Sequence, residues 1–148
     1  MQEWIQVDLD TEKLKQKKDV RGVVIELLVS PYDIPEAVRG FFDDEKNHFA
    51  IEFKYVGSGN EPTKDKQDDE MILRTGENSG RLYRLEVDVK ALDVNAVGLQ
   101  MRVKKEINEA LDQLIKQPSK RSANYKLAKE AITSNQHPLF DALAVAHA

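Results

Sequence analysis

The spacing of apolar residues changes near residue 93 of this 148-residue chain, and that change limits the folds open to it. Upstream, apolar residues recur at every second position, as in a strand with one buried face. The clearest run is Phe49, Ile51, Phe53 and Tyr55. Downstream they recur at every third or fourth position, as in a helix with one apolar stripe. That series is Leu99, Val103, Ile107, Ala110, Leu111 and Leu114. Strands first and helices last predict an α+β fold.

The α+β prediction is a single domain over residues 1–148. Its sheet is expected to be mostly antiparallel, with about five to six strands within residues 3–90. Its helices are expected at about residues 95–117, 120–134 and 138–145, packed on one face of the sheet. The apolar fraction of 41% and the charged fraction of 32% fit a water-soluble globular protein with one core.

Two β-hairpins are predicted within the strand region. Residues 36–42 and 48–56 flank the polar segment DDEKN, and residues 71–75 and 81–90 flank GENSG. For the segment after Pro35, a short helix opened by that proline is the alternative. In the second hairpin, the side chains expected to face the core are Tyr83, Leu85, Val87 and Val89.

The segment VRGVVIELLV at residues 20–29 is apolar on both faces, so it is predicted to be a central strand. One face would carry Val23, Ile25, Leu27 and Val29, and the other would carry Val20, Val24 and Leu28. If the helices cover one face of the sheet, the second set needs other cover, from the N-terminal segment or from a second copy of the chain. Val20, Val24 and Leu28 are therefore a candidate homodimer patch.

The segment GSGNEPTKDKQDDE at residues 57–70 mixes glycines with acidic and basic residues. A dinucleotide-binding fingerprint would need glycine where Pro62 stands, and a P-loop would need glycine where Thr63 precedes Lys64. The acids lack the spacing of a calcium loop, and lysines interrupt them. The segment is therefore predicted to be a long, charged, mobile hairpin loop without a site of its own.

The polar face of the sheet is the strongest candidate surface in the sequence. Its predicted binding residues are Glu52, Lys54, Arg84, Glu86 and Asp88, with Gln6 and Asp8 beside them. Paired carboxylates can do acid–base chemistry or hold a divalent cation where water is excluded, with Arg84 as an anion clamp. A solvated ladder of cross-strand pairs, each contributing about 0.2–1 kcal/mol, is favoured instead. The reasons are that basic residues alternate with the acids and that little apolar sequence remains to cover the face.

Composition excludes several classes of site. The chain has no cysteine, so disulfides, thiolate nucleophiles and iron–sulfur clusters are excluded. His48, His137 and His147 lack a metal-binding spacing, and no serine lies in a nucleophile elbow, so no metal, cofactor or catalytic residue is predicted. The N-terminus lacks the apolar core of a signal peptide, and the apolar run at residues 23–29 is too short to cross a membrane. The expected location is the cytoplasm.

Charge is unevenly distributed along the chain, whose net charge is −4. Residues 1–98 carry 14 Lys/Arg and 21 Asp/Glu, whereas residues 99–132 carry eight Lys/Arg and four Asp/Glu. Such a basic segment can bind nucleic acid. Acids dilute it, however, and Tyr125 is the one aromatic residue within it, so nucleic-acid binding is only a minor alternative.

Together these features predict a non-catalytic binding or protein-interaction module, with self-association or an unspecified protein or small molecule as its partner. The main alternative is a small metal-assisted or acid–base enzyme that uses Glu52, Glu86 and Asp88 of the polar face. The second alternative is a weak nucleic-acid binder that uses the basic helices.

Overall fold

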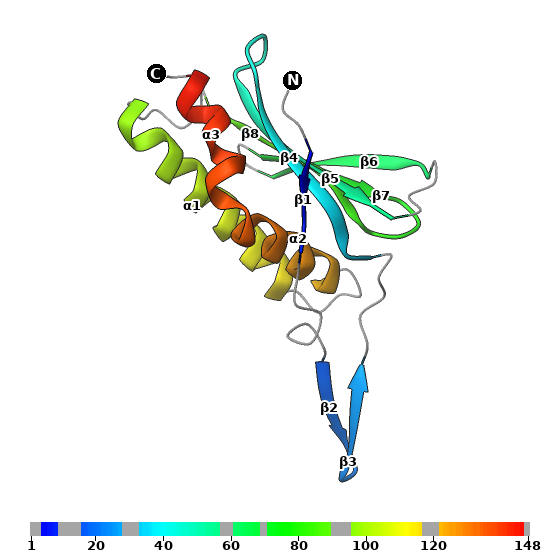
Figure 1. Ribbon diagram of the computed structural model, residues 1–148. Coiled ribbons are helices and arrows are strands. Elements are labelled where there is room, and N and C mark those ends of the chain that lie inside the picture. Colours follow the sequence, from blue (N-terminus) through cyan, green and yellow to red (C-terminus); the bar gives the residue numbers. More distant parts are fainter. Residues whose placement is uncertain are drawn as a thin grey trace.

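The computed structural model describes residues 4–8, 16–27, 33–56, 61–68, 71–89, 96–116 and 122–146. The strands of its main sheet are β1 Ile5–Gln6, β4 Pro35–Asp43, β5 His48–Tyr55, β6 Thr63–Asp68, β7 Met71–Gly76 and β8 Leu82–Asp88. They lie in the order β1-β4-β5-β8-β7-β6, and all neighbours are antiparallel. The helices follow the strands in sequence and lie on one side of the sheet (Figure 1), which confirms the α+β fold.

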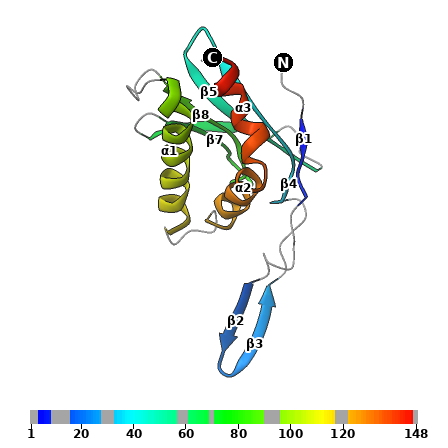
Figure 2. The ribbon, with the colours of Figure 1, turned by 60° about the vertical axis from the view of Figure 1, so that its left-hand side comes forward.

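The three C-terminal helices are α1 Ala96–Lys116, α2 Ser122–Ser134 and α3 Gln136–Ala146. Their ends lie within two residues of the predicted ones. The apolar stripe of α1 is buried, as at Val103, Ile107 and Leu111. Figure 2 shows the helices beside one another on the same side of the sheet. None of these described helices is both long enough and apolar enough to cross a membrane.

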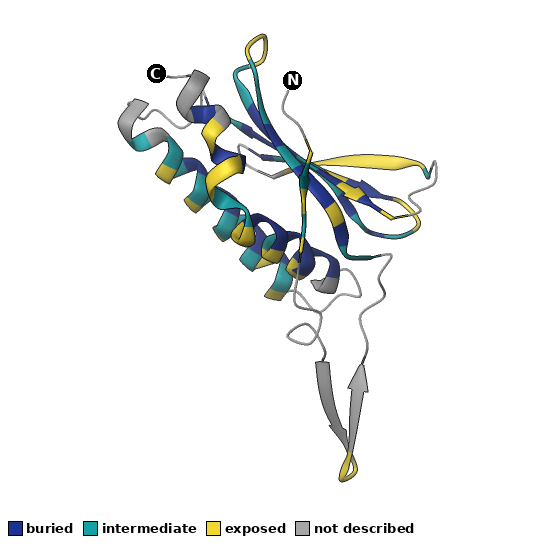
Figure 3. Ribbon diagram, in the orientation of Figure 1, coloured by how far each residue is buried: buried dark blue, intermediate teal, exposed yellow. Residues whose placement is uncertain are grey.

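The core lies between the helices and the sheet. The side chains that β5 contributes are all buried as predicted (Figure 3): Phe49, Ile51, Phe53 and Tyr55. The ring of Phe49 stacks on that of Phe140 in α3, with centroids 5.3 Å apart. Helix α3 also comes close to β4 at Gly40, where a Cβ would collide with the carbonyl oxygen of Leu139. Aromatic stacking and close backbone approach therefore hold α3 on the sheet.

Both predicted hairpins are confirmed, since β4 pairs with β5 and β7 pairs with β8. At the β4–β5 turn the Asp43 carboxylate accepts hydrogen bonds from the backbone N–H groups of Glu45 and Lys46, at 3.1 and 3.3 Å. The alternative of a short helix after Pro35 is wrong, because that segment is a nine-residue strand in register with β5.

Along β8, Leu85 and Val87 are buried as predicted, as is Val89 just after the strand, but Tyr83 is only partly buried. The register between β7 and β8 shifts after Arg74, so that Leu82 lies opposite Thr75 and Tyr83 is skipped. A bulge of this kind re-aims the side chains around it. Leu82 therefore fills the core position that alternation assigned to Tyr83.

The prediction of a central strand at residues 20–29 is wrong. The chain reverses at Arg21 and Gly22, whose φ angles are 53° and 80°. Two residues with positive φ form the tight turn typical of a β-hairpin. The hairpin consists of β2 Gln16–Val20 and β3 Val23–Leu27, which form a separate two-stranded sheet that projects from the main one (Figures 1 and 2).

The candidate dimer patch lies on this hairpin. Val20 and Val24 belong to β2 and β3, but their side chains are outside the described part of the structure, as is the whole of Leu28. The patch therefore stays a prediction.

The prediction of a long loop at residues 57–70 needs correction. Residues 63–68 form the edge strand β6, paired with β7 along its whole length. Residues 57–60 and 69–70 are outside the described residues. Figure 3 shows that β6 is exposed, so the strand buries no apolar face and has no alternating pattern to reveal it. Lys64 and Lys66 are typical of an edge strand that must not pair with other chains.

Candidate functional site

A row of five charged residues crosses the face of the sheet opposite the helices. Arg39 of β4 lies opposite Glu52 of β5, which lies opposite Arg84 of β8. Arg84 in turn lies opposite Arg74 of β7, which lies opposite Asp65 of β6. Directly opposite residues point to the same face. The residues next to the row that face the helices are buried on β4, β5 and β7, as at Val38, Ile51 and Leu73. We call these five residues the charged row.

Glu52 bridges two arginines within the charged row. Arg39 Nε–H donates to Glu52 Oε1 at 2.7 Å, and Arg84 Nη1 lies 3.5 Å from Glu52 Oε2. Arg84 Nη2–H also donates to Glu86 Oε1 at 2.5 Å. These are the cross-strand pairs expected of a ladder, and they hold the long arginine side chains in place.

The far end of the charged row is a pair between Arg74 and Asp65. Arg74 donates two hydrogen bonds to the Asp65 carboxylate, at 2.9 and 3.3 Å. The hydrogen bond from Arg74 lowers the pKa of Asp65. The two side chains are 45% and 50% exposed, so this pair remains open to a partner as well as to water.

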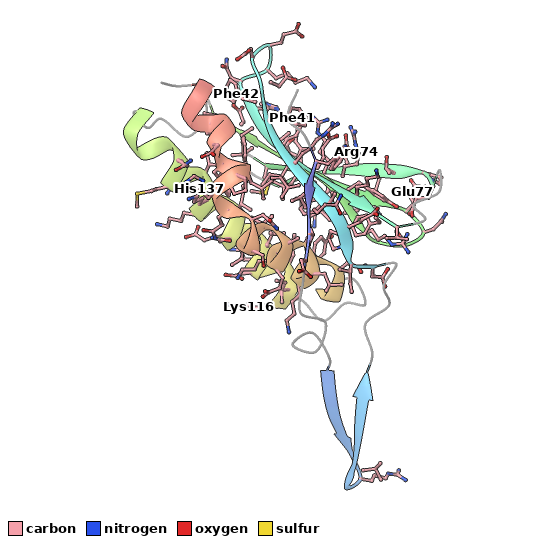
Figure 4. All side chains as sticks on the ribbon, viewed as in Figure 1. Phe41, Phe42, Arg74, Glu77, Lys116 and His137 are labelled. Carbon is pink, nitrogen blue, oxygen red and sulfur yellow. The ribbon has the colours of Figure 1, made fainter. Side chains whose placement is uncertain are left out.

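Two aromatic rings lie against the guanidinium groups of this face. Arg39 Cζ lies 4.4 Å from the ring centroid of Trp4 and 5.8 Å from that of Phe41, and Arg84 Cζ lies 5.1 Å from that of Phe41. Cations at such distances are attracted to the ring face. Figure 4 shows Phe41 and Arg74 on the side of the sheet away from the helices. The polar face thus has a partial aromatic cover that the sequence did not reveal.

Glu86 is the buried charged residue of the polar face, with 8% of its surface exposed. His48 Nδ1 lies 3.9 Å from Glu86 Oε2. Among the described atoms, His48 Nδ1 and Arg84 Nε are buried without a hydrogen-bond partner. A histidine beside an enclosed carboxylate has the components of acid–base chemistry. No group of three or more histidine and acidic side chains in the described ranges is arranged to hold a metal ion.

Three of the five predicted binding residues form one connected set, namely Glu52, Arg84 and Glu86. Lys54 lies opposite Ala37 and is exposed, and Asp88 lies opposite His48. The residues of this face that the sequence did not place on it are Trp4, Arg39, Phe41, His48, Arg74 and Asp65. Alternation along β4 could have placed Arg39 and Phe41 on this face. Which residues of the adjacent strands lie beside them depends on the register between the strands.

Comparisons with known proteins do not place this chain in a family. A scan of protein-family models found no match, and searches of curated proteins and of solved structures found none either. Function is therefore argued from the side chains of the polar face.

Several basic residues of the helices form ion pairs with acidic residues of α1. The pairs are Arg102 with Glu106, Lys105 with Glu109, and Lys129 with Asp112. Tyr125 is buried, so it offers no ring on which a base could stack. The described helices therefore lack the exposed basic and aromatic combination that favours nucleic-acid binding.

A second polar cluster centres on Glu61, within the segment predicted to have no site. Its carboxylate accepts hydrogen bonds from the Tyr83 hydroxyl at 2.8 Å and from the Ser79 backbone N–H and hydroxyl at 3.2 and 3.0 Å. Burial by itself would raise the pKa of Glu61, but the hydrogen bonds from Tyr83 and Ser79 outweigh it and lower the pKa. The cluster ties the chain before β6 to the β7–β8 hairpin.

Replacing Tyr83 by phenylalanine is expected to lower the free energy of unfolding by about 1.5 kcal/mol at neutral pH, because ionised Glu61 loses a donor. The pKa of Glu61 in the folded protein lies below its ordinary value of 4.5. Its hydrogen bonds therefore stabilise the fold above that pH, and this contribution is lost as the pH falls below it. Urea unfolding at neutral and at strongly acidic pH should show the difference between Y83F and the wild type shrinking in acid. A difference independent of pH would contradict ionised Glu61 as the acceptor.

Proposed function

We propose that this chain is a non-catalytic protein-interaction module of the cytoplasm that binds its partner with the polar face of the sheet. The observation that supports this most is a group of side chains on that face, Trp4, Arg39, Phe41 and Arg84, in which rings lie against guanidinium groups. We call it the aromatic–arginine cluster. Tryptophan and arginine are enriched among the residues that contribute most to protein–protein binding. The cytoplasmic location is inferred from a chain without cysteine.

The aromatic–arginine cluster is held in place before any partner arrives. Glu52 anchors both Arg39 and Arg84, and Phe41 lies beside both guanidinium groups. A binding surface with fixed side chains loses less conformational entropy when it binds. Trp4 is 36% exposed, so a partner can still cover part of it. Charges of both signs beside the cluster would orient the partner.

The second candidate function is an acid–base enzyme centred on Glu86 and His48. The buried Nδ1 of His48 without a hydrogen-bond partner favours it. The ion pair of Glu86 with Arg84 opposes it, because Arg84 already occupies Glu86 Oε1 and the buried carboxylate leaves a substrate little access. A small ligand that stabilised the wild type but not Glu86→Gln would favour the enzyme over the interaction module.

Site-specific photo-crosslinking tests the proposed interaction. A photo-reactive amino acid in place of exposed Lys54 on the polar face is expected to form protein adducts in the cells that make this chain. Trp4→Ala in the same protein should lower their yield at least about tenfold, because loss of a strong interface residue costs 2 kcal/mol or more.

The matched control carries the same amino acid in place of Met101 on α1, which is 75% exposed. It should not give the adducts seen at position 54. The interaction proposal fails if positions 54 and 101 give the same adducts, or if Trp4→Ala leaves the adducts at position 54 unchanged.

A further inference from the structure

We propose that the partner of the polar face is a second copy of this chain, packed face to face about a two-fold axis. This inference rests on the proposed interaction function of that face. Its support is the order of charges along the charged row. From β4 to β6 the charges are positive, negative, positive, positive and negative, at Arg39, Glu52, Arg84, Arg74 and Asp65.

A two-fold axis parallel to β8, between the copies, reverses the strand order of one copy relative to the other. Strand β8 is the centre of the row, with β5 and β4 on one side and β7 and β6 on the other. The axis therefore places β4 over β6 of the second copy, β5 over β7, and β8 over β8. Such an interface uses the same patch on both copies, so the patch must be complementary to itself.

The charged row meets that requirement when it is reversed. Arg39 of one copy lies over Asp65 of the other, and Glu52 lies over Arg74. Each contact occurs twice because of the symmetry. Sheets that pack face to face lie about 10 Å apart, a gap that an arginine and a carboxylate side chain can fill together. Asp65 and Arg74 are about half exposed, which leaves room for these additional contacts.

The next row along the strands fits the same arrangement. Ala50 of β5 and Ile72 of β7 both lie opposite Glu86 of β8, on either side of it. The axis places Ile72, which is partly exposed, over the row of the second copy that holds Phe41 and the fully buried Ala50, so Ile72 and Phe41 supply the apolar contact beside the charge pairs. Interfaces commonly combine an apolar centre with polar contacts around it.

The centre of the interface is balanced in charge. Arg84 approaches Arg84 of the second copy at the axis, but each arrives with Glu86 bound at 2.5 Å. Two guanidinium groups and two carboxylates therefore meet there, so the centre carries no net charge. Like charges alone at this place would repel the copies.

The other two-fold axis in the plane of the interface, across the strands, does not fit. It would place β4 over β4 and β6 over β6 of the second copy. When this axis runs along the charged row, Arg39 lies over Arg39 and Asp65 over Asp65 of the second copy. Because like charges across an interface cost several kcal/mol, the order of charges selects the axis parallel to β8.

Reversing one half of the charged row tests the inference and leaves the pair within each chain intact. In the first variant, Asp65→Arg is combined with Arg74→Asp, which places like charges over Arg39 and Glu52 of the second copy. Sedimentation velocity at low salt should show the dissociation constant of the wild-type dimer rising about 100-fold or more. As a matched control, Arg102→Glu combined with Glu106→Arg reverses a pair on α1 and should leave it unchanged.

A mixing experiment separates complementarity from misfolding. The second variant combines Arg39→Glu with Glu52→Arg and reverses the other half of the row. Each variant alone should be monomeric with a wild-type circular dichroism spectrum. An equimolar mixture should form a mixed dimer. In it, each reversed charge of the first variant lies over a charge of opposite sign in the second variant. If the second variant does not fold, the first variant and its control decide the matter.

Wild-type protein that stays monomeric at high micromolar concentration and low salt would overturn this inference. So would a folded first variant that dimerises as tightly as the wild type. If the dimer is contradicted in this way but position 54 still forms adducts with other proteins, the proposed interaction function of the polar face is retained. If position 54 forms no adduct either, both proposals are contradicted.

Discussion

Replacing Phe49 by alanine is expected to lower the free energy of unfolding by about 3–5 kcal/mol. Phe49 is fully buried, lies opposite Phe42 and Val87 on the neighbouring strands, and stacks on Phe140 of α3. Its removal leaves a cavity where the sheet meets the helices. Because domains of this size have about 5–15 kcal/mol of stability, the variant should lose a large part of it. Thermal unfolding should show a fall in Tm of about 10 °C or more.

The control for this cavity is Met101→Ala. Met101 belongs to the same two-layer structure but is 75% exposed, so its truncation should change the stability by no more than about 0.5 kcal/mol. If F49A and M101A shifted the Tm equally, the stack between β5 and α3 would not be part of the core.

The elements with a regular apolar period were predictable from the sequence. In α1 the period of 3.6 comes from Val103, Ile107 and Leu111, which face the core together. In β5 the period of 2 comes from side chains such as Phe49 and Ile51, buried on one face of the strand. Each pattern is local, because the geometry of a single helix or strand determines which residues share a face. Its bounds could therefore be predicted without knowing what the element packs against.

The elements that bury no apolar stripe were not predictable in this way. Strand β6 is exposed along residues 63–67, and pairing with β7 alone makes it a strand. At the β2–β3 hairpin, the apolar run of residues 20–29 hid the turn at Arg21, which is an uncommon residue for positive φ. A continuous apolar run reports burial, but a change of chain direction within it depends on one or two backbone angles.

The candidate site was half predictable for a related reason. Glu52 and Arg84 lie on strands with clear alternation, so their shared face followed from the sequence. Arg39 lies in a segment for which the sequence also allows a short helix, and Asp65 lies in a segment that the sequence predicts to be a loop. Their places at the two ends of the charged row come from pairing between strands, which sequence periodicity does not specify.

Strand β4 links the core to the polar face, because one side of it packs against α3 and the other side carries residues of the aromatic–arginine cluster. Gly40 faces α3, whereas Arg39 and Phe41, on either side of it, face away from the helices. A change at Gly40 should therefore disturb both layers. Trp4, the single tryptophan of the chain, lies 4.4 Å from Arg39 Cζ, so its fluorescence reports on the polar face.

Gly40→Ala is expected to lower the free energy of unfolding by about 3 kcal/mol, the upper part of the range for overpacking. The added methyl group would collide with the Leu139 carbonyl oxygen and crowd the Phe49 ring, and a backbone atom cannot turn away as a side chain can. Either α3 or β4 must move, so we also expect a shift in Trp4 emission in the folded variant.

Gly22→Ala is the matched control. The surroundings of Gly22 are open but its φ is 80°, so the substitution should lower the free energy of unfolding by only about 1 kcal/mol, through backbone strain. It should leave Trp4 emission unchanged. Equal losses of stability in the two variants would contradict the close approach of α3 to β4, and with it the coupling between the helical layer and the polar face.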